Sequence, residues 1–260
     1  MKEFFNLLTS NWWGIVVICV VALAFLIIVS ALLYKPFFKR FYDVFLSGLA
    51  ILVLSPVLLI LIVLGAIKMN GNPFFTQLRP GKINKKTGKE KIFKLIKFRT
   101  MTNAKDENGN LLPDDKRLTK YGKILRSTSL DELPELFNIF VGHMSIVGPR
   151  PQLVRDMVFM SEIVRKRHNV RGGLTGLAQV SGRNNISWED KFDYDLKYIE
   201  KISLWKDIAI IIKTVFKVLK RSDIARDGTE SDIDYGDWLL EKEMISMEEY
   251  KEKQIQAKII

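Results

Sequence analysis

The sequence predicts an α+β protein: a predominantly helical cytoplasmic domain with a short β-hairpin, anchored by one N-terminal transmembrane helix and a re-entrant membrane helix broken at Ser55-Pro56. Residues 14–33 and 44–67 contain no charged side chain, and about 20 apolar residues in a helix are enough to cross a bilayer core. Helical periodicity returns several times after residue 130. Between these regions, two short apolar stretches flank a turn rich in glycine and lysine.

The first apolar run is expected to be a retained transmembrane helix within residues 1–35. Only Lys2 and Glu3 precede it as charged residues, and no small-x-small cleavage site follows it, so a cleaved signal peptide is the less favoured alternative. Cys19, the single cysteine of the chain, lies inside this run. An intrachain disulfide framework is therefore excluded, as is usual in a reducing compartment.

The second apolar run, within residues 36–70, is expected to enter and leave the membrane on the same face. Basic residues precede and follow it, and the positive-inside rule places both groups in the cytoplasm. The groups are Lys35, Lys39 and Arg40 before the run, and Lys68, Arg79, Lys82, Lys85, Lys86, Lys89 and Lys91 after it. Pro56 removes a helix hydrogen bond and kinks the helix, which predicts helix, break, helix. A kinked helix that spans the bilayer is the alternative.

Residues 71–221 are expected to form the cytoplasmic domain. Residues 74–78 and 92–101 fit the two strands of a hairpin, and the polar residues 103–117 fit a loop. Helices are predicted around residues 133–141, 153–167, 188–202 and 204–219. The last of these carries lysines along one side and fits a helix in the membrane interface with Trp205 at headgroup level, although an ordinary core-facing helix has the same pattern.

Charge divides the chain into a basic body and an acidic tail. Residues 222–260 carry a net charge of −6, which leaves +17 on residues 1–221. A basic body attached to a bilayer attracts anionic headgroups and polyphosphate ligands. Nucleic acid is a poor partner, because the chain is tethered to a membrane and lacks RNP-type aromatic motifs. The tail is predicted to contain one helix over residues 237–253, and the two histidines, His143 and His168, are too few for a zinc site.

Asp131 and Glu132 are the candidate catalytic residues. Pro134 lacks an amide hydrogen and fits only the first turn of a helix, which places both carboxylates at a helix N-terminus. The macrodipole favours their ionised forms there. Such carboxylates can hold a divalent cation or attack phosphorus. The structural alternative is an acidic cap in which Ser129 and Glu132 form a capping box.

Several motifs, in order and spacing, resemble those of the bacterial sugar transferases, also called monotopic phosphoglycosyl transferases. The resemblance covers roughly residues 36–221. The motifs are KR (39–40), SP (55–56), QLRPG (77–81), KFRTM (97–101), RSTSLDELP (126–134), MSIVGPRP (144–151) and GLTGLAQVSGRN (173–184). Two positions depart from the family pattern: His143 stands where an aspartate is common, and Gly172 stands where a proline is usual.

The resemblance implies transfer of sugar-1-phosphate from a UDP-sugar to polyprenol (undecaprenyl) phosphate on the cytoplasmic face of the bacterial inner membrane. This reaction would begin the assembly of a surface polysaccharide or a glycoprotein glycan. Asp131 would be the nucleophile that forms an aspartyl phosphosugar intermediate, and Glu132 would share Mg²⁺ with it. The implied substrate-binding residues are Arg126, Arg150, Arg183, Lys97, Arg99, Asn184 and Gln179.

A membrane-anchored adaptor without catalysis, whose basic surface binds anionic lipid or acidic partners, is the alternative from another class. It accounts for the charge of the body, but it leaves the paired acids at a helix start unexplained.

Asp193-Tyr194-Asp195 looks like the metal-binding DxD motif of nucleotide-sugar glycosyltransferases. Residues two apart on a helix point about 200° apart around its axis, which is poor geometry for one ion. This segment is therefore expected to be a solvated helix face.

Overall fold

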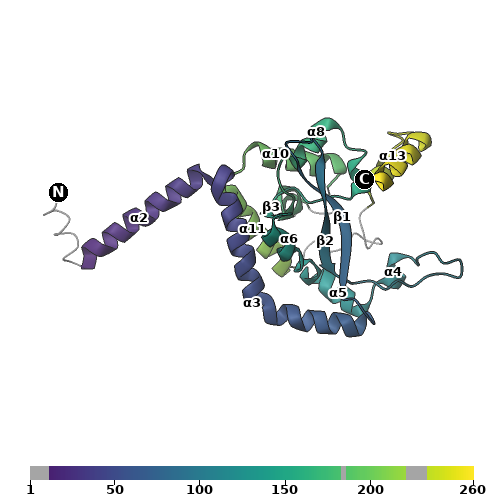
Figure 1. Ribbon diagram of the computed structural model, residues 1–260, viewed down its shortest axis with the longest axis horizontal. Coiled ribbons are helices and arrows are strands. Elements are labelled where there is room, and N and C mark those ends of the chain that lie inside the picture. Colours follow the sequence, from purple (N-terminus) through teal and green to yellow (C-terminus); the bar gives the residue numbers. More distant parts are fainter. Residues whose placement is uncertain (1–11, 183–185, 221–232) are drawn as a thin grey trace.

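Two long apolar helices begin the part of the chain that the computed structural model describes, which comprises residues 12–182, 186–220 and 233–260. The first, α2 (Trp12–Leu32), projects away from the rest of the protein (Figure 1). Only Gly14 and Ser30 are buried in it. Both α2 and the next helix, α3 (Lys39–Lys68), are long and apolar enough to cross a membrane. An apolar helix without a protein partner on most of its surface is suited to a lipid environment.

A five-residue π-helix, η1 (Tyr34–Phe38), joins α2 to α3. Helix α3 contains Pro56 and bends part-way along its length (Figure 1). Ser55 Oγ donates to the carbonyl of Leu52 at 2.8 Å, beside the position where the proline ring displaces a backbone hydrogen bond. The helix continues on both sides of Pro56. The interruption predicted at Ser55-Pro56 is therefore a bend within one helix rather than a full break.

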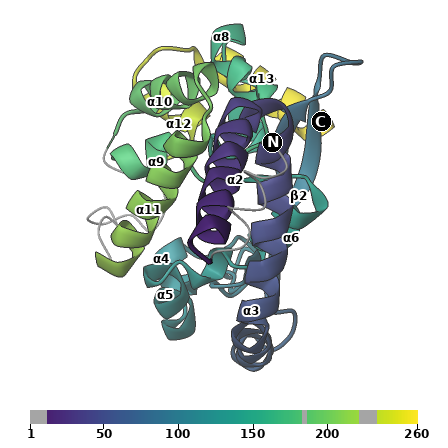
Figure 2. The ribbon, with the colours of Figure 1, turned by 90° about the vertical axis from the view of Figure 1, so that its left-hand side faces the viewer.

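Both halves of α3 pack against the body of the protein. Figure 2 shows the first part of α3 beside α6. Before Pro56, apolar side chains of α3 cover a cluster formed by Phe93, Leu95, Leu136, Ile139 and Met144. After it, Leu58 and Leu61 join a second cluster with Phe98 and Leu125. One side of α3 is thus part of the hydrophobic core on both sides of Pro56, while most of its other apolar side chains remain exposed.

The sheet structure consists of two small pairs of strands. β1 (Phe74–Ile83) and β2 (Glu90–Phe98) form an antiparallel hairpin with an irregularity between Pro80 and Ile83. This confirms the predicted hairpin, with a longer first strand and a second strand that begins and ends earlier than predicted. β3 (Ser145–Val147) and β4 (Gly173–Thr175) pair in parallel. Between the hairpin and β3 lie α4 (Asp114–Arg117), α5 (Lys120–Ser127), the 3₁₀ turn η2 (Leu130–Glu132) and α6 (Glu135–Val141).

The single helix predicted over residues 153–167 is wrong. The segment forms α7 (Val154–Met157), α8 (Glu162–Arg165) and the 3₁₀ turn η3 (Lys166–Asn169). After α7, the amides of Phe159 and Met160 donate to carbonyls three residues back, those of Asp156 and Met157, so the chain tightens into a turn instead of continuing as an α-helix. Ser161 then starts α8 by accepting a hydrogen bond from the Val164 amide at 3.3 Å.

Of the helices after β4, the two long ones, α10 and α11, agree with the periodicity, whereas the short α9 was not predicted. α9 (Leu177–Ser181), α10 (Trp188–Glu200) and α11 (Leu204–Lys220) pack around Val147, Val180, Tyr198 and Ile210. In α11, Ile210 is buried in this core, whereas a second set of large apolar side chains is exposed: Trp205, Ile208, Ile212, Val215, Phe216 and Leu219. The helix therefore faces the core and also presents an apolar surface outward.

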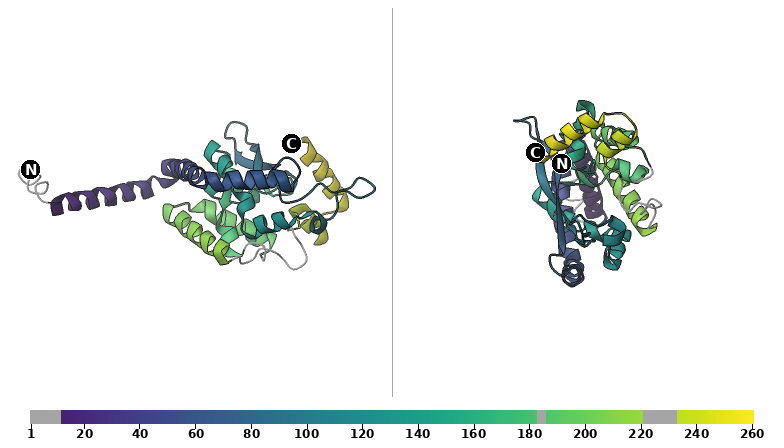
Figure 3. Two further views of the ribbon diagram at one scale, coloured as in Figure 1. Left: turned by 90° about the horizontal axis from the view of Figure 1, so that it is seen from below. Right: turned by 90° about the vertical axis from the view of Figure 1, so that its right-hand side faces the viewer.

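The acidic tail forms two helices, α12 (Tyr235–Glu241) and α13 (Met247–Ile259), which lie against one end of the body (Figure 3). The prediction of one helix over residues 237–253 is wrong because the chain turns after α12, where Glu243 has a φ of 55°. Ser246 caps the new helix by accepting a hydrogen bond from the Glu249 amide at 3.1 Å.

Candidate active site

The two candidate catalytic carboxylates lie in η2, immediately before α6. Pro134 is the N-cap of α6 with a φ of −63°, as the sequence predicted for a proline at a helix start. Ser129, which precedes η2, has a φ of 56° and makes no capping hydrogen bond with its side chain. The capping box is therefore absent. A non-glycine residue in this left-handed conformation is strained, and such strain is often found beside functional sites.

Glu132 is held by two cations from different parts of the fold. Its Oε1 accepts a hydrogen bond from Lys97 Nζ of β2 at 2.7 Å and from Arg150 Nη2, in the loop after β3, at 2.8 Å. Burial opposes ionisation of Glu132, but Arg150 and Lys97 hold its pKa well below its usual range. Glu132 is therefore a fixed anion, and its attraction in turn raises the pKa of Arg150.

Asp131 has a different environment from its neighbour. Burial and the adjacent Glu132 raise its pKa, while Lys97, Arg126 and Arg150 act in the opposite direction. In the described part of the chain, no group forms a hydrogen bond or ion pair with its carboxylate. Both acids were expected to be ionised at the helix N-terminus. In the structure, Glu132 is paired with two cations, whereas the Asp131 carboxylate has no hydrogen-bond or ion-pair partner among the described residues.

Glu135, in the first turn of α6, is a third buried acid that the sequence reasoning missed. Its Oε1 lies 3.1 Å from Lys97 Nζ. Burial raises its pKa to about 7, with Glu132 adding to the effect and Lys97 and Arg150 opposing it. The spacing in the sequence indicates this role, because residues three apart on a helical turn lie on one face and Glu135 follows Glu132 at that spacing. Lys97 thus lies between two acids and ties β2 to the turn that carries the dyad.

A small cavity adjoins this cluster and is lined by Arg79, Leu95, Lys97, Glu135, Arg150 and Pro151. Arg79 donates to the Pro151 carbonyl at 3.0 Å and to Gln77 Oε1 at 2.7 Å. Its Nε is buried and has no hydrogen-bond partner among the described residues. Burial, followed by the nearby Arg150, lowers the pKa of Arg79 to about 10. Three cationic side chains around one opening favour an anionic ligand.

Among the other predicted substrate-binding residues, Arg126 lies near Asp131, whereas the described part of the structure shows no contact of Arg99 or Gln179 with the dyad. Arg126 lies in the last turn of α5, where its Nε donates to Thr100 Oγ1 at 3.2 Å. Its charge opposes the rise in the pKa of Asp131. Arg99 is half-buried at the end of β2. Gln179 Nε2 donates to the Leu174 carbonyl at 3.0 Å, a contact that supports the loop before α9. Arg183 and Asn184 lie outside the described residues.

Asp195 corrects the expectation of a solvated face at residues 193–195. It is 2% exposed and accepts hydrogen bonds from Arg167 Nε at 2.9 Å and Nη2 at 2.5 Å. The expectation failed because this side of α10 packs against η3, whose Arg167 is 28 residues away in sequence. The same Arg167 Nη2 donates to the Arg150 carbonyl at 2.7 Å, so the buried ion pair also supports the active-site loop.

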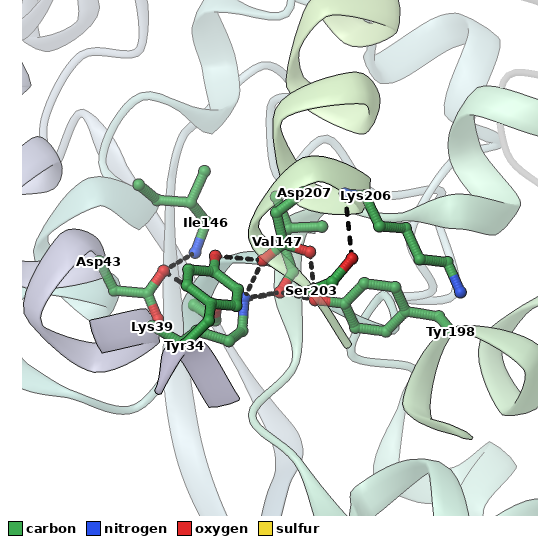
Figure 4. A network of polar contacts seen from close by, with 10 residues as sticks. Tyr34, Lys39, Asp43, Ile146, Val147, Tyr198, Ser203, Lys206 and Asp207 are labelled. Carbon is green, nitrogen blue, oxygen red and sulfur yellow. Dashed lines mark hydrogen bonds and ion pairs between the residues drawn. The ribbon is translucent and has the colours of Figure 1, made fainter. Parts of the chain in front are cut away.

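A second polar network connects β3 to the start of α3 (Figure 4). Lys39 Nζ donates to Asp207 Oδ2 of α11 at 2.6 Å and to the Val147 carbonyl at 2.9 Å. Tyr198 donates to Asp207 Oδ1 at 2.8 Å, and burial and Asp207 raise its pKa so that it remains a donor. Asp43 accepts from the Ile146 amide at 2.9 Å. Because β3 leads directly into the loop with Arg150, this network fixes the base of that loop relative to α3.

Comparison with known proteins agrees with this arrangement. The family model of the bacterial sugar transferases matches residues 34–221. An uncharacterized sugar transferase of Bacillus subtilis, EpsL, is 43% identical over 181 residues, which cover 70% of this chain and 87% of that protein. The exopolysaccharide production protein ExoY of Sinorhizobium fredii is 38% identical over 200 residues, 68% of this chain and 83% of that one.

A third relative is longer than this chain. The UDP-glucose:undecaprenyl-phosphate glucose-1-phosphate transferase of Klebsiella pneumoniae is 39% identical over 190 residues, which cover 69% of this chain but only 40% of the relative. Residues 34–221, which the family model matches, contain the dyad, both cationic partners of Glu132 and the apolar helix α3. The chain therefore belongs to the bacterial sugar transferase family.

Proposed function

We propose that this phosphoglycosyl transferase moves sugar-1-phosphate from a UDP-sugar to undecaprenyl phosphate, with UMP as the second product. The relative from Klebsiella pneumoniae is named for this type of donor and acceptor. The observation that carries the proposal is the difference between the two acids: Glu132 is neutralised by Lys97 and Arg150, while Asp131 accepts no hydrogen bond from any described group. An uncommitted carboxylate in a cationic site is suited to attack a diphosphate.

In the first step, an oxygen of the Asp131 carboxylate attacks the phosphorus bonded to the sugar. A new O–P bond forms, the bond between that phosphorus and the bridging oxygen of UMP breaks, and UMP leaves with the electron pair. Arg150, Arg126 and Lys97 place positive charge where negative charge develops on the phosphoryl oxygens. The guanidinium fork of Arg150 is also able to bind phosphate oxygens in pairs.

In the second step, an oxygen of the lipid phosphate attacks the same phosphorus and the bond to Asp131 breaks. The product is undecaprenyl diphosphate sugar, and the carboxylate is regenerated without a net proton change on Asp131. Dividing the reaction in this way allows a water-soluble donor and a membrane-bound acceptor to use one site in turn.

The dyad is chemically suited to Mg²⁺. Two adjacent carboxylates offer the oxygen ligands that this cation prefers, and Mg²⁺ commonly takes one or two carboxylates together with substrate phosphates. Within the described residues, no group of three or more histidine, cysteine, aspartate or glutamate side chains is arranged to hold an ion alone. Asp131 and Glu132 would therefore share Mg²⁺ with the substrate, and the cation would neutralise charge on the diphosphate.

The membrane anchor suits a lipid acceptor. The phosphate of a polyprenol stays at headgroup level, so the dyad must lie near the bilayer surface. The bent α3 packs beside α6, which follows the dyad, and exposed apolar side chains of α11 such as Trp205 and Phe216 suit an interfacial position. We place α3 as a re-entrant helix in the bacterial inner membrane, with the catalytic domain on the cytoplasmic face.

The product would enter the assembly of a surface polysaccharide or a glycoprotein glycan. One relative, from Sinorhizobium fredii, is named as an exopolysaccharide production protein. Lys97, Arg99, Arg126, Arg150, Gln179, Arg183 and Asn184 remain the proposed substrate-binding residues.

The test is a donor half-reaction. Purified protein is incubated with Mg²⁺ and each member of a panel of UDP-sugars, without lipid. We expect release of UMP close to one equivalent per enzyme with the correct donor, and a phosphosugar adduct on the peptide that contains Asp131. Addition of undecaprenyl phosphate should then give continuous turnover. An adduct on another side chain, or a strict need for both substrates at once, would refute the covalent route.

A further inference from the structure

The C-terminal helices α12 and α13 lie outside the region that matches the family, residues 34–221, but they pack against the segment that follows the active-site loop. Tyr235 and Trp238 of α12 cover an aromatic cluster with Trp188 and Phe192. The backbone at Gly236 approaches Phe159 so closely that a Cβ would lie 2.5 Å from its ring. Figure 3 shows both helices against the body in two views. The tail is therefore docked by specific packing.

Asp156 connects this tail to the active-site loop. It lies in α7 and is 2% exposed, and each of its two carboxylate oxygens accepts a hydrogen bond from a different segment. Oδ1 accepts from the Tyr235 amide at 2.9 Å, and Oδ2 accepts from the Leu153 amide at 3.2 Å. Arg155 and Asp234 form an ion pair beside this bridge. Loss of one of these two donors leaves a buried carboxylate oxygen unsatisfied, which is costly, so loss of the Tyr235 bond favours a shift of Asp156 that also disturbs its bond to Leu153.

The loop of residues 149–153 is held at successive backbone groups. The Pro149 carbonyl accepts from the Gly173 amide at 2.9 Å, the Arg150 carbonyl from Arg167 at 2.7 Å, and the Pro151 carbonyl from Arg79 at 3.0 Å. The Leu153 amide, on Asp156, is the next point of support, and it is the one that leads to the tail. The side chain of Arg150 leaves this loop to reach Glu132 at 2.8 Å.

We infer that the C-terminal segment 234–253 is a positioning element of the active site, which acts through Asp156 to keep the Arg150 loop in place against Glu132. This inference rests on the proposed function. Asp156 and Tyr235 are positioning residues: they touch no substrate, and their effect reaches the reaction through Arg150. A displacement of a binding group by about 1 Å can reduce a rate by about 100-fold, so loss of one support is expected to be measurable.

A pair of substitutions at Tyr235 isolates the critical hydrogen bond. Tyr235→Pro removes the amide hydrogen that Asp156 accepts, whereas Tyr235→Ala removes the same ring but keeps the amide. Tyr235 is the first residue of α12, a position where proline is well tolerated. Asp234 already has φ −64° and ψ 153°, the extended conformation that a residue before proline prefers. Comparison of the two variants therefore removes the contribution of the lost ring.

In full-length protein, kcat and KM for the UDP-sugar are measured in the complete reaction, with undecaprenyl phosphate present, together with hydrogen exchange at the Leu153 amide. We expect Tyr235→Pro to lower kcat/KM by about ten-fold relative to Tyr235→Ala, and to speed exchange at Leu153, at similar thermal stability. Asp156→Asn, which retains only one acceptor oxygen, should resemble Tyr235→Pro. Equal kcat/KM in the two Tyr235 variants, with or without faster exchange, would overturn the inference.

The outcome separates this inference from the proposed function. If the unsubstituted protein released no UMP with any donor, the proposed function would fail while exchange at Leu153 still reported whether the tail supports the loop. If UMP is released and the two Tyr235 variants differ as expected, the proposed function and the positioning role of the tail are both supported.

Discussion

Arg150 Nη2 and Glu132 Oε1 lie 2.8 Å apart and join the loop after β3 to the turn before α6. The same carboxylate oxygen accepts a hydrogen bond from Lys97 Nζ of β2. Three separate elements therefore meet at one atom beside Asp131. Breaking this pairing would leave a buried charge without its partner, which is costly in protein interiors.

Asp131→Asn is expected to abolish UMP release in the donor half-reaction, with a fall of at least about 10³-fold, because an amide oxygen is a poor nucleophile. Rapid-quench measurement of UMP in a single turnover checks this. Asp115→Asn serves as the matched control, since Asp115 is exposed in α4 and should leave the burst unchanged. A full burst in the Asp131 variant would remove the basis of the mechanism.

Glu135→Gln is expected to stabilise the protein at high pH. Burial raises the pKa of Glu135 to about 7 in the folded protein, above the usual value of 4.5. The protonated form therefore contributes stability that is complete below pH 4.5 and lost as the pH rises through 7.

Replacement by the neutral amide should remove that loss, which amounts to up to roughly 3 kcal/mol. Thermal unfolding in detergent at pH 5 and pH 8.5 would measure it. Lys97, Glu132 and Arg150 face the same carboxyl group and are unchanged in this variant. A variant with the same stability difference from the parent at both pH values would show that Glu135 does not titrate as described.

Lys39→Met is expected to destabilise the protein by about 3 kcal/mol, because Asp207 loses its cationic partner while it stays buried. The double variant Lys39→Met/Asp207→Asn should recover part of this loss. The midpoint of thermal unfolding in detergent checks both. Lys213→Met, at an exposed position of α11, should change stability by less than about 0.5 kcal/mol. Strict additivity of the two single substitutions would argue against a coupled pair.

Labelling of single cysteines should place residue 2 outside the cell and residues 37 and 72 inside, in a background where Cys19 is replaced by serine. A re-entrant α3 brings both of its ends to the cytoplasmic face, as the basic residues around it indicate. A membrane-impermeant thiol reagent applied to intact and opened cells distinguishes the faces. Labelling of residues 37 and 72 from opposite sides would establish a spanning helix instead.

Local signals predicted much of the fold and the centre of the site. Pro134 alone was enough to place Asp131 and Glu132 at a helix start, because proline restricts the backbone before it and has no amide hydrogen. The hairpin was predicted from two apolar stretches around a turn rich in glycine and lysine, and α10 and α11 were predicted from helical periodicity.

Contacts between distant parts of the chain were not predictable in the same way. An aspartate on a helix is usually exposed to solvent. Asp195 is buried here because it pairs with Arg167, which is distant in the sequence. The turn between α12 and α13 was readable in part, because Ser246 followed by Glu249 is a helix-start signal. No glycine or proline lies between Trp238 and Lys253, so the turn at Glu243 was not predicted and one helix was expected.

The packing of α3 has a practical consequence for anyone who works with this enzyme. Side chains of α3 cover Leu136, Ile139 and Phe98, which belong to the catalytic half of the chain. A shortened version that begins after residue 70 would expose these apolar groups to water and would be expected to aggregate. Helix α3 and the catalytic residues thus belong to one folding unit. Removal of the N-terminal residues up to the end of α3 is therefore not expected to give a water-soluble fragment.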